Sequence, residues 1–219
     1  MTLYFAKDPK GNFGDDLNEI VWPRLIPHVW DRDPSHLFIG IGTILNDRIP
    51  NAPLKTVFGA GYGYGALPRL QEGRWDFHVV RGPITADALN LAPQTVVTDP
   101  GILVRRIFQN GTRPRNQRVS FMPHHITDQN ADWSTICEDA GIQYISPRAP
   151  LHQVAEAIDS SDRLLTEAMH GAIAADAFRV PWKALEIFDG FNREKWRDWC
   201  LSMEIEYSPT QIQHLWGLE

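Results

Sequence analysis

Short apolar runs alternate with amphipathic segments along the chain. Runs typical of strands lie, in the first half, at Leu3–Phe5, Leu37–Ile41, Thr56–Phe58, Phe77–Val80 and Thr95–Val97, and in the second half at Val119–Met122, Gln143–Ile145, Arg163–Leu165, Lys183–Ile187 and Ile205–Tyr207. Helices are expected at Ala131–Ala140, Leu151–Asp159, Gly171–Phe178, Arg193–Met203 and Gln211–Trp216. Alternation of this kind is typical of βα units with parallel strands. The sequence therefore predicts an α/β fold.

One polar stretch divides this pattern. Residues Gln109 to Gln117 contain NGTRPRNQ, where Gly, Pro and charged residues replace the apolar periodicity. We therefore expect two α/β domains with parallel sheets, residues 1–108 and 118–219, joined by a linker at 109–117. Two such halves facing each other would form a cleft, the usual place for an active site.

The composition argues against a nucleic-acid partner, a membrane-spanning segment and a disulfide framework. The 219 residues carry 21 basic and 27 acidic side chains, a net charge of −6, and no Lys/Arg stripe, so a nucleic-acid partner is not expected. No apolar stretch approaches the roughly 20 residues needed to cross a bilayer, and the first residues lack a signal-peptide core. Cys137 and Cys200 match neither a disulfide framework nor a zinc site, so we expect both to be buried thiols in the cytoplasm.

The stretch Lys7–Asn18, KDPKGNFGDDLN, joins the first strand to a helix. Gly11 and Gly14 permit sharp turns and close approach of a ligand, at the end of a sheet where ligands bind in open α/β folds. Asp15 or Asp16 can cap the helix. Two carboxylates exceed what one cap requires, so a functional carboxylate and a solvated second Asp are both open interpretations.

Val79–Pro83 ends a strand with Arg81 and starts a helix with Pro83 in its first turn. An Arg beside exposed helix N–H groups suits a carboxylate or phosphate, because the guanidinium and the helix dipole act on the same anion. The alternative is a structural Arg that pairs with Asp76 or Asp87.

The stretch Leu164–Ala172 runs from a strand into a helix of small residues that can pack close to the sheet. His170 is expected near the helix start, where an imidazole can bind an anion or transfer a proton. Glu167 lies three residues upstream, and a carboxylate there can fix the tautomer of the imidazole.

Weaker signals follow other strands. The glycine-rich run Phe58–Gly65 lacks dinucleotide-binding spacing, and we interpret it as a loop that lines a ligand, with Gly61 as its candidate contact. Gly40–Thr43 has the same ambiguity. His124 and His125 follow the first strand of the second half, but no third residue is spaced to complete a metal site, so no metal is expected.

These motifs together resemble the polysaccharide pyruvyl transferase family of bacterial exopolysaccharide synthesis. The resemblance rests on GNFGDDLN, VRGPITADAL, TDPGIL, PHH and TEAMHGAIAADAFRVPW, in the order of the family. It implies two Rossmann-like domains as in glycosyltransferases of the B class, and transfer of pyruvate from phosphoenolpyruvate to a sugar as a ketal. Carried over by motif position, the resemblance implies that Arg81 and His170 bind phosphoenolpyruvate and that Met169 lines its pocket. Many members have Arg where this chain has Ala168, so another residue must supply that anion contact.

The chemistry of a ketal transfer calls for carboxylates, without assigning a role to each one. A proton reaches the methylene carbon, two sugar hydroxyls attack C2, and phosphate leaves; carboxylates can accept the hydroxyl protons and stabilise positive charge at C2. The candidates are Asp15, Asp16 and Glu167, with His170 as the acid or base. The further candidates for binding substrate are Asn12, Gly14, Gly61 and His124. Phosphoenolpyruvate is then a substrate, and no step requires a metal or redox cofactor.

Two alternatives stay open. The same Arg and helix termini suit the diphosphate of a sugar nucleotide, as in a glycosyltransferase of the same fold, and a non-catalytic saccharide-binding homologue would also keep the fold. In each case the partner is a saccharide, either free or lipid-linked. We expect the protein in the cytoplasm, free or transiently at the inner face of the membrane.

Overall fold

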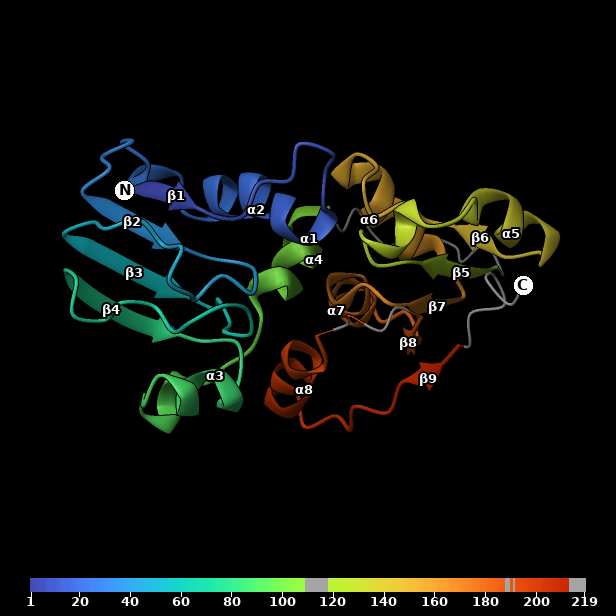
Figure 1. Ribbon diagram of the computed structural model, residues 1–219. Coiled ribbons are helices and arrows are strands. Elements are labelled where there is room, and N and C mark those ends of the chain that lie inside the picture. The colour runs from blue at the N-terminus through green and yellow to red at the C-terminus, as the bar shows by residue number, and fades with distance from the viewer. Residues whose placement is uncertain (109–117, 188–189, 191, 213–219) are drawn as a thin grey trace. The chain divides into compact units, whose positions relative to one another are not determined.

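The computed structural model describes residues 1–108, 118–187, 190 and 192–212. These residues form a mixed α/β structure with two separate parallel sheets (Figure 1). The predicted α/β class with parallel strands is therefore confirmed. The arrangement of two domains as in glycosyltransferases of the B class, with a cleft, stays a prediction.

The first sheet has the strand order β1-β2-β3-β4, and all neighbouring strands are parallel. Its strands are β1 (Thr2–Tyr4), β2 (His36–Ile39), β3 (Leu54–Phe58) and β4 (Arg74–Val79). Ile39 pairs with Tyr4 on one side and Val57 on the other, and both Ile39 and Val57 are fully buried. Burial on both faces explains why β2 reads as a continuous apolar run and not as an alternating one.

The second sheet has the order β6-β5-β7-β8-β9, again with parallel neighbours. Its strands are β5 (Val119–Met122), β6 (Gln143–Tyr144), β7 (Arg163–Thr166), β8 (Trp182–Glu186) and β9 (Thr210–Gln211). Phe121, Trp133 and Leu185 belong to the apolar core on this sheet. Side chains that follow β5 and β7 leave the sheet at the same edge, because parallel strands share their direction.

The described residues contain eight α-helices. They are α1 (Phe13–Asp16), α2 (Asn18–Leu25), α3 (Pro83–Ala88), α4 (Val104–Phe108), α5 (Trp133–Asp139), α6 (Leu151–Ser160), α7 (Met169–Ala177) and α8 (Arg193–Ser202). Four short 3-10 helices lie at Pro27–Val29, Pro93–Thr95, Pro100–Leu103 and Thr127–Gln129. Helix α7 contacts β7 and β8, and Ala172, Ala174 and Ala175 on it are fully buried, as its small residues predicted.

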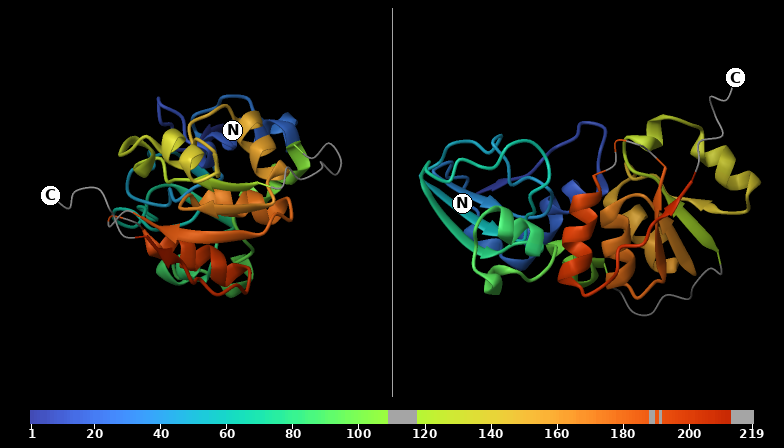
Figure 2. Two further views of the ribbon diagram at one scale, coloured as in Figure 1. Left: turned by 90° about the vertical axis from the view of Figure 1, so that its right-hand side faces the viewer. Right: turned by 60° about the horizontal axis from the view of Figure 1, so that its bottom comes forward.

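The chain forms two compact units, and neither is one continuous stretch. The first contains Met1–Lys7, Gly14–Gly101 and Asn192–Tyr207; the second contains Asp8–Phe13, Ile102–Phe191 and Ser208–Glu219. These groupings differ from the continuous boundaries expected from the sequence, because α8 belongs with the first sheet and residues 8–13 with the second. Within the first unit, α8 lies beside α3 although more than 100 residues separate them (Figures 1 and 2). The predicted linker 109–117 falls outside the described residues.

Several local predictions were wrong. Thr95–Val97 is not a strand: a 3-10 turn ends at Thr95, and Val96 makes only an isolated bridge to Val80. Ile205–Tyr207 is not a strand either, and Gln211, expected in a helix, lies in β9, while residues 213–216 fall outside the described part of the chain.

Asp15 and Asp16 do not cap a helix. Both lie inside α1, which already begins at Phe13, and the residue at the N-cap of α2 is Leu17. Two acidic side chains in a first turn still suit the helix dipole. Cys137 and Cys200 are free and buried, as predicted.

Candidate functional site

Arg81 lies at the carboxyl edge of the first sheet, just beyond β4, and its side chain is fully buried. The guanidinium donates three hydrogen bonds: Nη1 to Thr43 Oγ1 at 2.7 Å, Nη2 to the Tyr62 carbonyl at 3.0 Å, and Nε to Asp198 Oδ2 at 3.0 Å. Arg81 therefore binds to both the segment after β2 and the segment after β3. The second of these contains Gly61, which we expected to line a ligand.

The ion-pair partner of Arg81 is Asp198 on α8, and neither Asp76 nor Asp87 takes this place; Asp76 pairs with Arg74. Asp198 is 1% exposed, and its carboxylate also accepts the Thr85 N–H at 3.0 Å and the Thr85 hydroxyl at 2.6 Å.

Close packing explains the glycine after Arg81. A Cβ on Gly82 would stand 2.0 Å from the Asp198 carbonyl oxygen and 2.4 Å from its carboxylate, so only glycine lets α8 approach α3 this closely. Arg81 and Thr85 thus donate hydrogen bonds to one carboxylate of α8, that of Asp198. Sequence reasoning missed Asp198 because 117 residues separate it from Arg81.

Gly61 packs against the same guanidinium. A Cβ at this position would lie 2.1 Å from Arg81 Cζ, and the Gly61 N–H donates to the Gly42 carbonyl at 2.9 Å. The absence of a side chain at Gly61 therefore makes room for Arg81.

Asp15 and Asp16 lie half-buried on α1, after the buried Gly14. Asp15 Oδ1 is 3.1 Å from the position that a Cβ on Gly42 would take, which places this carboxylate at the carboxyl end of β2. Asn18, fully buried at the start of α2, fixes this arrangement.

The amide of Asn18 joins α1 and α2 to the end of β2. Its Nδ2 donates to the carbonyls of Asp15 and Ile41, each at 2.9 Å, and its Oδ1 accepts from the Ile41 N–H and from Trp22 Nε1. Asn18 was not among the predicted site residues, although it closes the GDDLN motif.

The second unit gathers its predicted residues at the carboxyl edge of the second sheet. Glu167 is fully buried after β7; its Oε2 accepts the His124 N–H at 3.1 Å and its Oε1 accepts the Ile187 N–H at 3.0 Å. The rings of His124 and His125 lie 4.2 Å apart between their centroids. One carboxylate thus holds the ends of β5 and β8 in place around two histidines.

Helix α7 begins directly beyond Glu167. Met169 is buried and His170 is half-buried, both in the first turn. A Cβ on Gly171 would lie 2.8 Å from both Met122 Sδ and Thr166 Oγ1, so glycine is needed for the helix to start this close to the sheet. Ala168, the N-cap residue, has no side chain that can cap the helix.

Residues 8–13, the first part of the glycine-containing loop, belong to this second unit. Arg148, after β6, donates from Nη1 to Asp8 and to the Gly11 carbonyl, each at 3.1 Å, and from Nη2 to the His125 carbonyl at 2.8 Å. The Lys10 N–H, and then Arg148, lower the pKa of Asp8. Arg148 was not predicted, since it follows a strand of two residues in an unremarkable stretch of sequence.

This arrangement also places Asn12. It lies half-buried between Gly11 and Phe13, whose N–H donates to the Pro147 carbonyl at 2.8 Å. The structure therefore brings His124 and Glu167 into contact, and Met169 and His170 lie two and three residues after Glu167 in the sequence. It brings Gly61 and Arg81 together in a second cluster.

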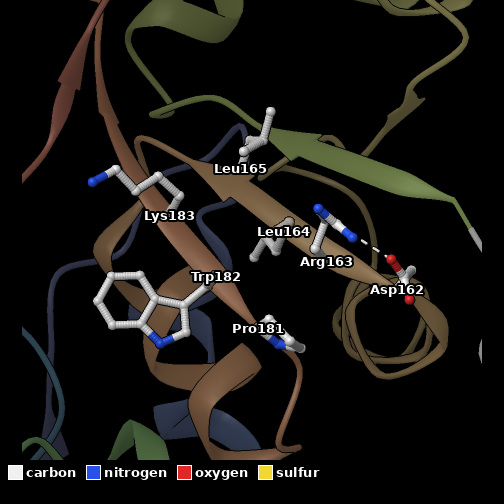
Figure 3. Close-up of a pocket in the computed structure, with 7 residues that line it drawn as sticks. All are labelled: Asp162, Arg163, Leu164, Leu165, Pro181, Trp182 and Lys183. Atoms are coloured by element: carbon white, nitrogen blue, oxygen red, sulfur yellow. Dashed lines mark hydrogen bonds and ion pairs between the residues drawn. The ribbon is translucent and has the colours of Figure 1, made fainter.

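Two surface cavities of the second unit lie at the opposite, amino-terminal ends of its strands. One, of about 330 Å³, is lined by the starts of β7 and β8; in Figure 3, Leu164 lies between Trp182 and Lys183 on one side and the ion pair of Arg163 with Asp162 on the other. The other, of about 480 Å³, lies beside β6 and α5. Neither includes a predicted site residue.

Within the described residues, no helix is long and apolar enough to cross a membrane. In the same part of the chain, no group of three or more His, Cys, Asp or Glu side chains is placed to hold a metal ion.

Comparison with known proteins identifies a relative. Over 214 residues the chain is 40% identical to the succinoglycan biosynthesis protein ExoV of Rhizobium meliloti (strain 1021), and the match covers 97% of this chain and 68% of that protein. No family model and no solved structure matches. Identity at this level over nearly the whole chain shows that the chain belongs to the family of the succinoglycan biosynthesis protein ExoV.

Proposed function

We propose that this protein acts in exopolysaccharide biosynthesis and transfers pyruvate from phosphoenolpyruvate to a saccharide, forming a ketal. The observation that carries the proposal is its 40% identity, over 97% of the chain, to a protein named for succinoglycan biosynthesis. The specific reaction rests on the motif resemblance and on the chemistry of the residues at the two carboxyl edges.

The start of α7 is our proposed donor site. Phosphoenolpyruvate carries a carboxylate and a phosphate, and a helix start without a side-chain cap offers backbone N–H groups and a positive dipole end to such anions. Met169 and His170 lie in this first turn. Glu167, two residues before the helix, accepts the backbone N–H of His124. Imidazoles that donate to an anion, together with a buried apolar neighbour, suit a small anionic donor.

The proposed reaction conserves every atom of both substrates. A proton is added to the methylene carbon of phosphoenolpyruvate, two hydroxyl oxygens of the saccharide lose their protons and bond to C2, and the C2–O bond to phosphate breaks. One of the two hydroxyl protons replaces the proton taken by the methylene carbon, and the other leaves with inorganic phosphate. Asp15 and Asp16 are the proposed acceptors of hydroxyl protons. Glu167, whose oxygens are fixed by two backbone N–H groups, is proposed to position His124 and to stabilise positive charge at C2.

For Arg81 we propose a supporting role in the same reaction. The three hydrogen-bond partners of its guanidinium are protein groups, so we propose that it holds the segments after β2 and β3 in the shape that a substrate meets. The reaction as written needs neither a metal nor a redox cofactor. The acceptor saccharide is free or lipid-linked, and the enzyme is proposed to work in the cytoplasm, free or at the inner membrane face.

Phosphate release with a defined acceptor tests the proposal. The protein is incubated with phosphoenolpyruvate and oligosaccharide fragments of succinoglycan, and inorganic phosphate and product mass are followed together. We expect phosphate and a pyruvylated oligosaccharide in equal amounts, and neither with the His170→Ala variant. Transfer of a sugar from a sugar nucleotide, with no use of phosphoenolpyruvate, would instead establish a glycosyltransferase.

A further inference from the structure

Tyr64 presents an exposed aromatic ring on a loop whose backbone is fixed at both sides. The residue keeps 41% of its surface exposed. Just before it, Asn192 Nδ2 donates to the Gly63 carbonyl at 2.5 Å; just after it, the Gly65 carbonyl accepts from the Tyr62 hydroxyl at 3.1 Å. An exposed ring on a rigid loop loses little conformational entropy when a ligand binds, which favours recognition.

Charged and polar groups surround this ring within the first unit. Lys195 Nζ lies 6.0 Å from the ring centroid, a cation–π distance. Burial of the hydroxyl raises the pKa of Tyr64; Arg81 opposes this rise, Asp15 adds to it, and a hydrogen bond with Asn192 opposes it. The charges of Arg81 and Asp15 therefore reach the Tyr64 hydroxyl, while 41% of the surface of the residue stays exposed.

We propose that Tyr64 is the stacking platform for the acceptor saccharide, with Asp15 as a partner for sugar hydroxyls. A pyranose has an apolar C–H face that packs on an aromatic ring and hydroxyl groups around its rim that a carboxylate accepts. This inference rests on the proposed function and names the site of its acceptor.

Of the charged groups that act on Tyr64, Arg81 is buried and paired with Asp198, whereas Asp15 is half-buried, so this position favours a neutral saccharide over an anionic ligand. A nucleotide or other phosphate on Tyr64 would meet the carboxylate of Asp15, which repels it. Lys195 is buried, 8% exposed, so its charge acts on the ring and is not presented to a ligand in solvent.

Binding of an oligosaccharide fragment of succinoglycan, measured by calorimetry without phosphoenolpyruvate, tests the proposal. We expect Tyr64→Ala to raise Kd about two- to tenfold, because aromatic stacking contributes about 0.5–1.5 kcal/mol beyond area burial. Tyr64→Phe, which keeps the ring, should bind within about twofold of the natural protein. Leu67→Ala is the matched control: Leu67 is 44% exposed near the same loop and should leave Kd unchanged.

Tyr64→Leu keeps apolar bulk and guards against loss of folding in the Ala variant, and it should weaken binding equally. Failure of the natural protein to bind the fragment, or unchanged Kd in both Tyr64→Ala and Tyr64→Leu, would overturn the inference. Tyr64-dependent binding with no turnover of phosphoenolpyruvate would support the saccharide site and refute pyruvyl transfer. Normal turnover of phosphoenolpyruvate, with an unchanged KM for the fragment in Tyr64→Ala, would support pyruvyl transfer and refute the saccharide site at Tyr64.

Discussion

Asp198→Ala is expected to lower the free energy of unfolding of the first unit by about 3–5 kcal/mol, since it leaves a buried guanidinium without its counter-ion. The carboxylate that this change removes accepts Arg81 Nε at 3.0 Å and two groups of Thr85, at 3.0 and 2.6 Å. Both charged side chains are essentially inaccessible, 0% and 1% exposed, so water cannot replace the lost partner without local opening.

The double variant Arg81→Met with Asp198→Leu separates charge from packing. No buried charge remains in it, so the main penalty disappears; the groups of Thr85 still lose their acceptor, which costs about 1–3 kcal/mol. We therefore expect the double variant to be more stable than Asp198→Ala. The control is Glu194→Gln on the same helix, where the carboxylate is 55% exposed and pairs with Arg197 at 3.1 Å; it should cost less than about 1 kcal/mol.

Urea unfolding followed by tryptophan fluorescence measures these differences. Trp196 and Trp199, two of the eight tryptophans, are buried on α8, so the loss of its packing contributes to the fluorescence change. In thermal melts the single variant should lose about 6–20 °C, at about 2–4 °C per kcal/mol for a chain of this size. A loss below about 1 kcal/mol in Asp198→Ala, or a double variant less stable than the single one, would refute the argument that this ion pair holds α8 in place.

Three further predictions concern the second unit and the thiols. His170→Ala should abolish pyruvyl transfer and leave the melting temperature nearly unchanged; ordinary turnover in a folded variant would remove His170 from the site. Burial raises the pKa of Cys137 and, to about 11, that of Cys200, so neither thiol should react with Ellman's reagent until denaturant is added, when two should react. Burial, and then its hydrogen bond to Asp128, raise the pKa of Tyr144 to about 12. The contribution of Tyr144 to the free energy of unfolding is therefore complete below pH 10 and is lost as the pH rises through about 12. Tyr144→Phe should remove the phenolate absorbance change that occurs at the highest pH. An unchanged titration in this variant would contradict the prediction.

The fold class follows from periodicity alone, because buried parallel strands need short, continuous apolar runs and their crossover helices need one apolar face. Val119–Met122 was predicted as a strand with its observed bounds, and Leu151–Asp159 as a helix that ends one residue later. Local patterns failed where tertiary context decides pairing. Thr95–Val97 has the composition of a strand, yet only Val96 finds a partner.

The candidate site was predictable to the extent that it lies at strand ends. Turns beyond parallel strands collect at one edge of a sheet, so Arg81, His124 and Glu167 could be selected from their positions in the sequence. Their partners could not be selected in this way. Asp198 looks like any charged residue of an amphipathic helix, and Arg148 belongs to no motif, although the strand before it, β6, was predicted.

The sequence by itself determined the two parallel sheets, the small-residue helix α7 and the groups of residues that follow the strands, because each depends on spacing within some 20 residues. Only the tertiary structure decided that α8 packs against α3 in the first unit, that residues 8–13 belong to the second unit, and that Arg81 is held by Asp198. These contacts join residues more than 100 positions apart. Their energy comes from desolvated charge and close packing around glycine, which depend on three-dimensional proximity and leave no periodic trace in the sequence.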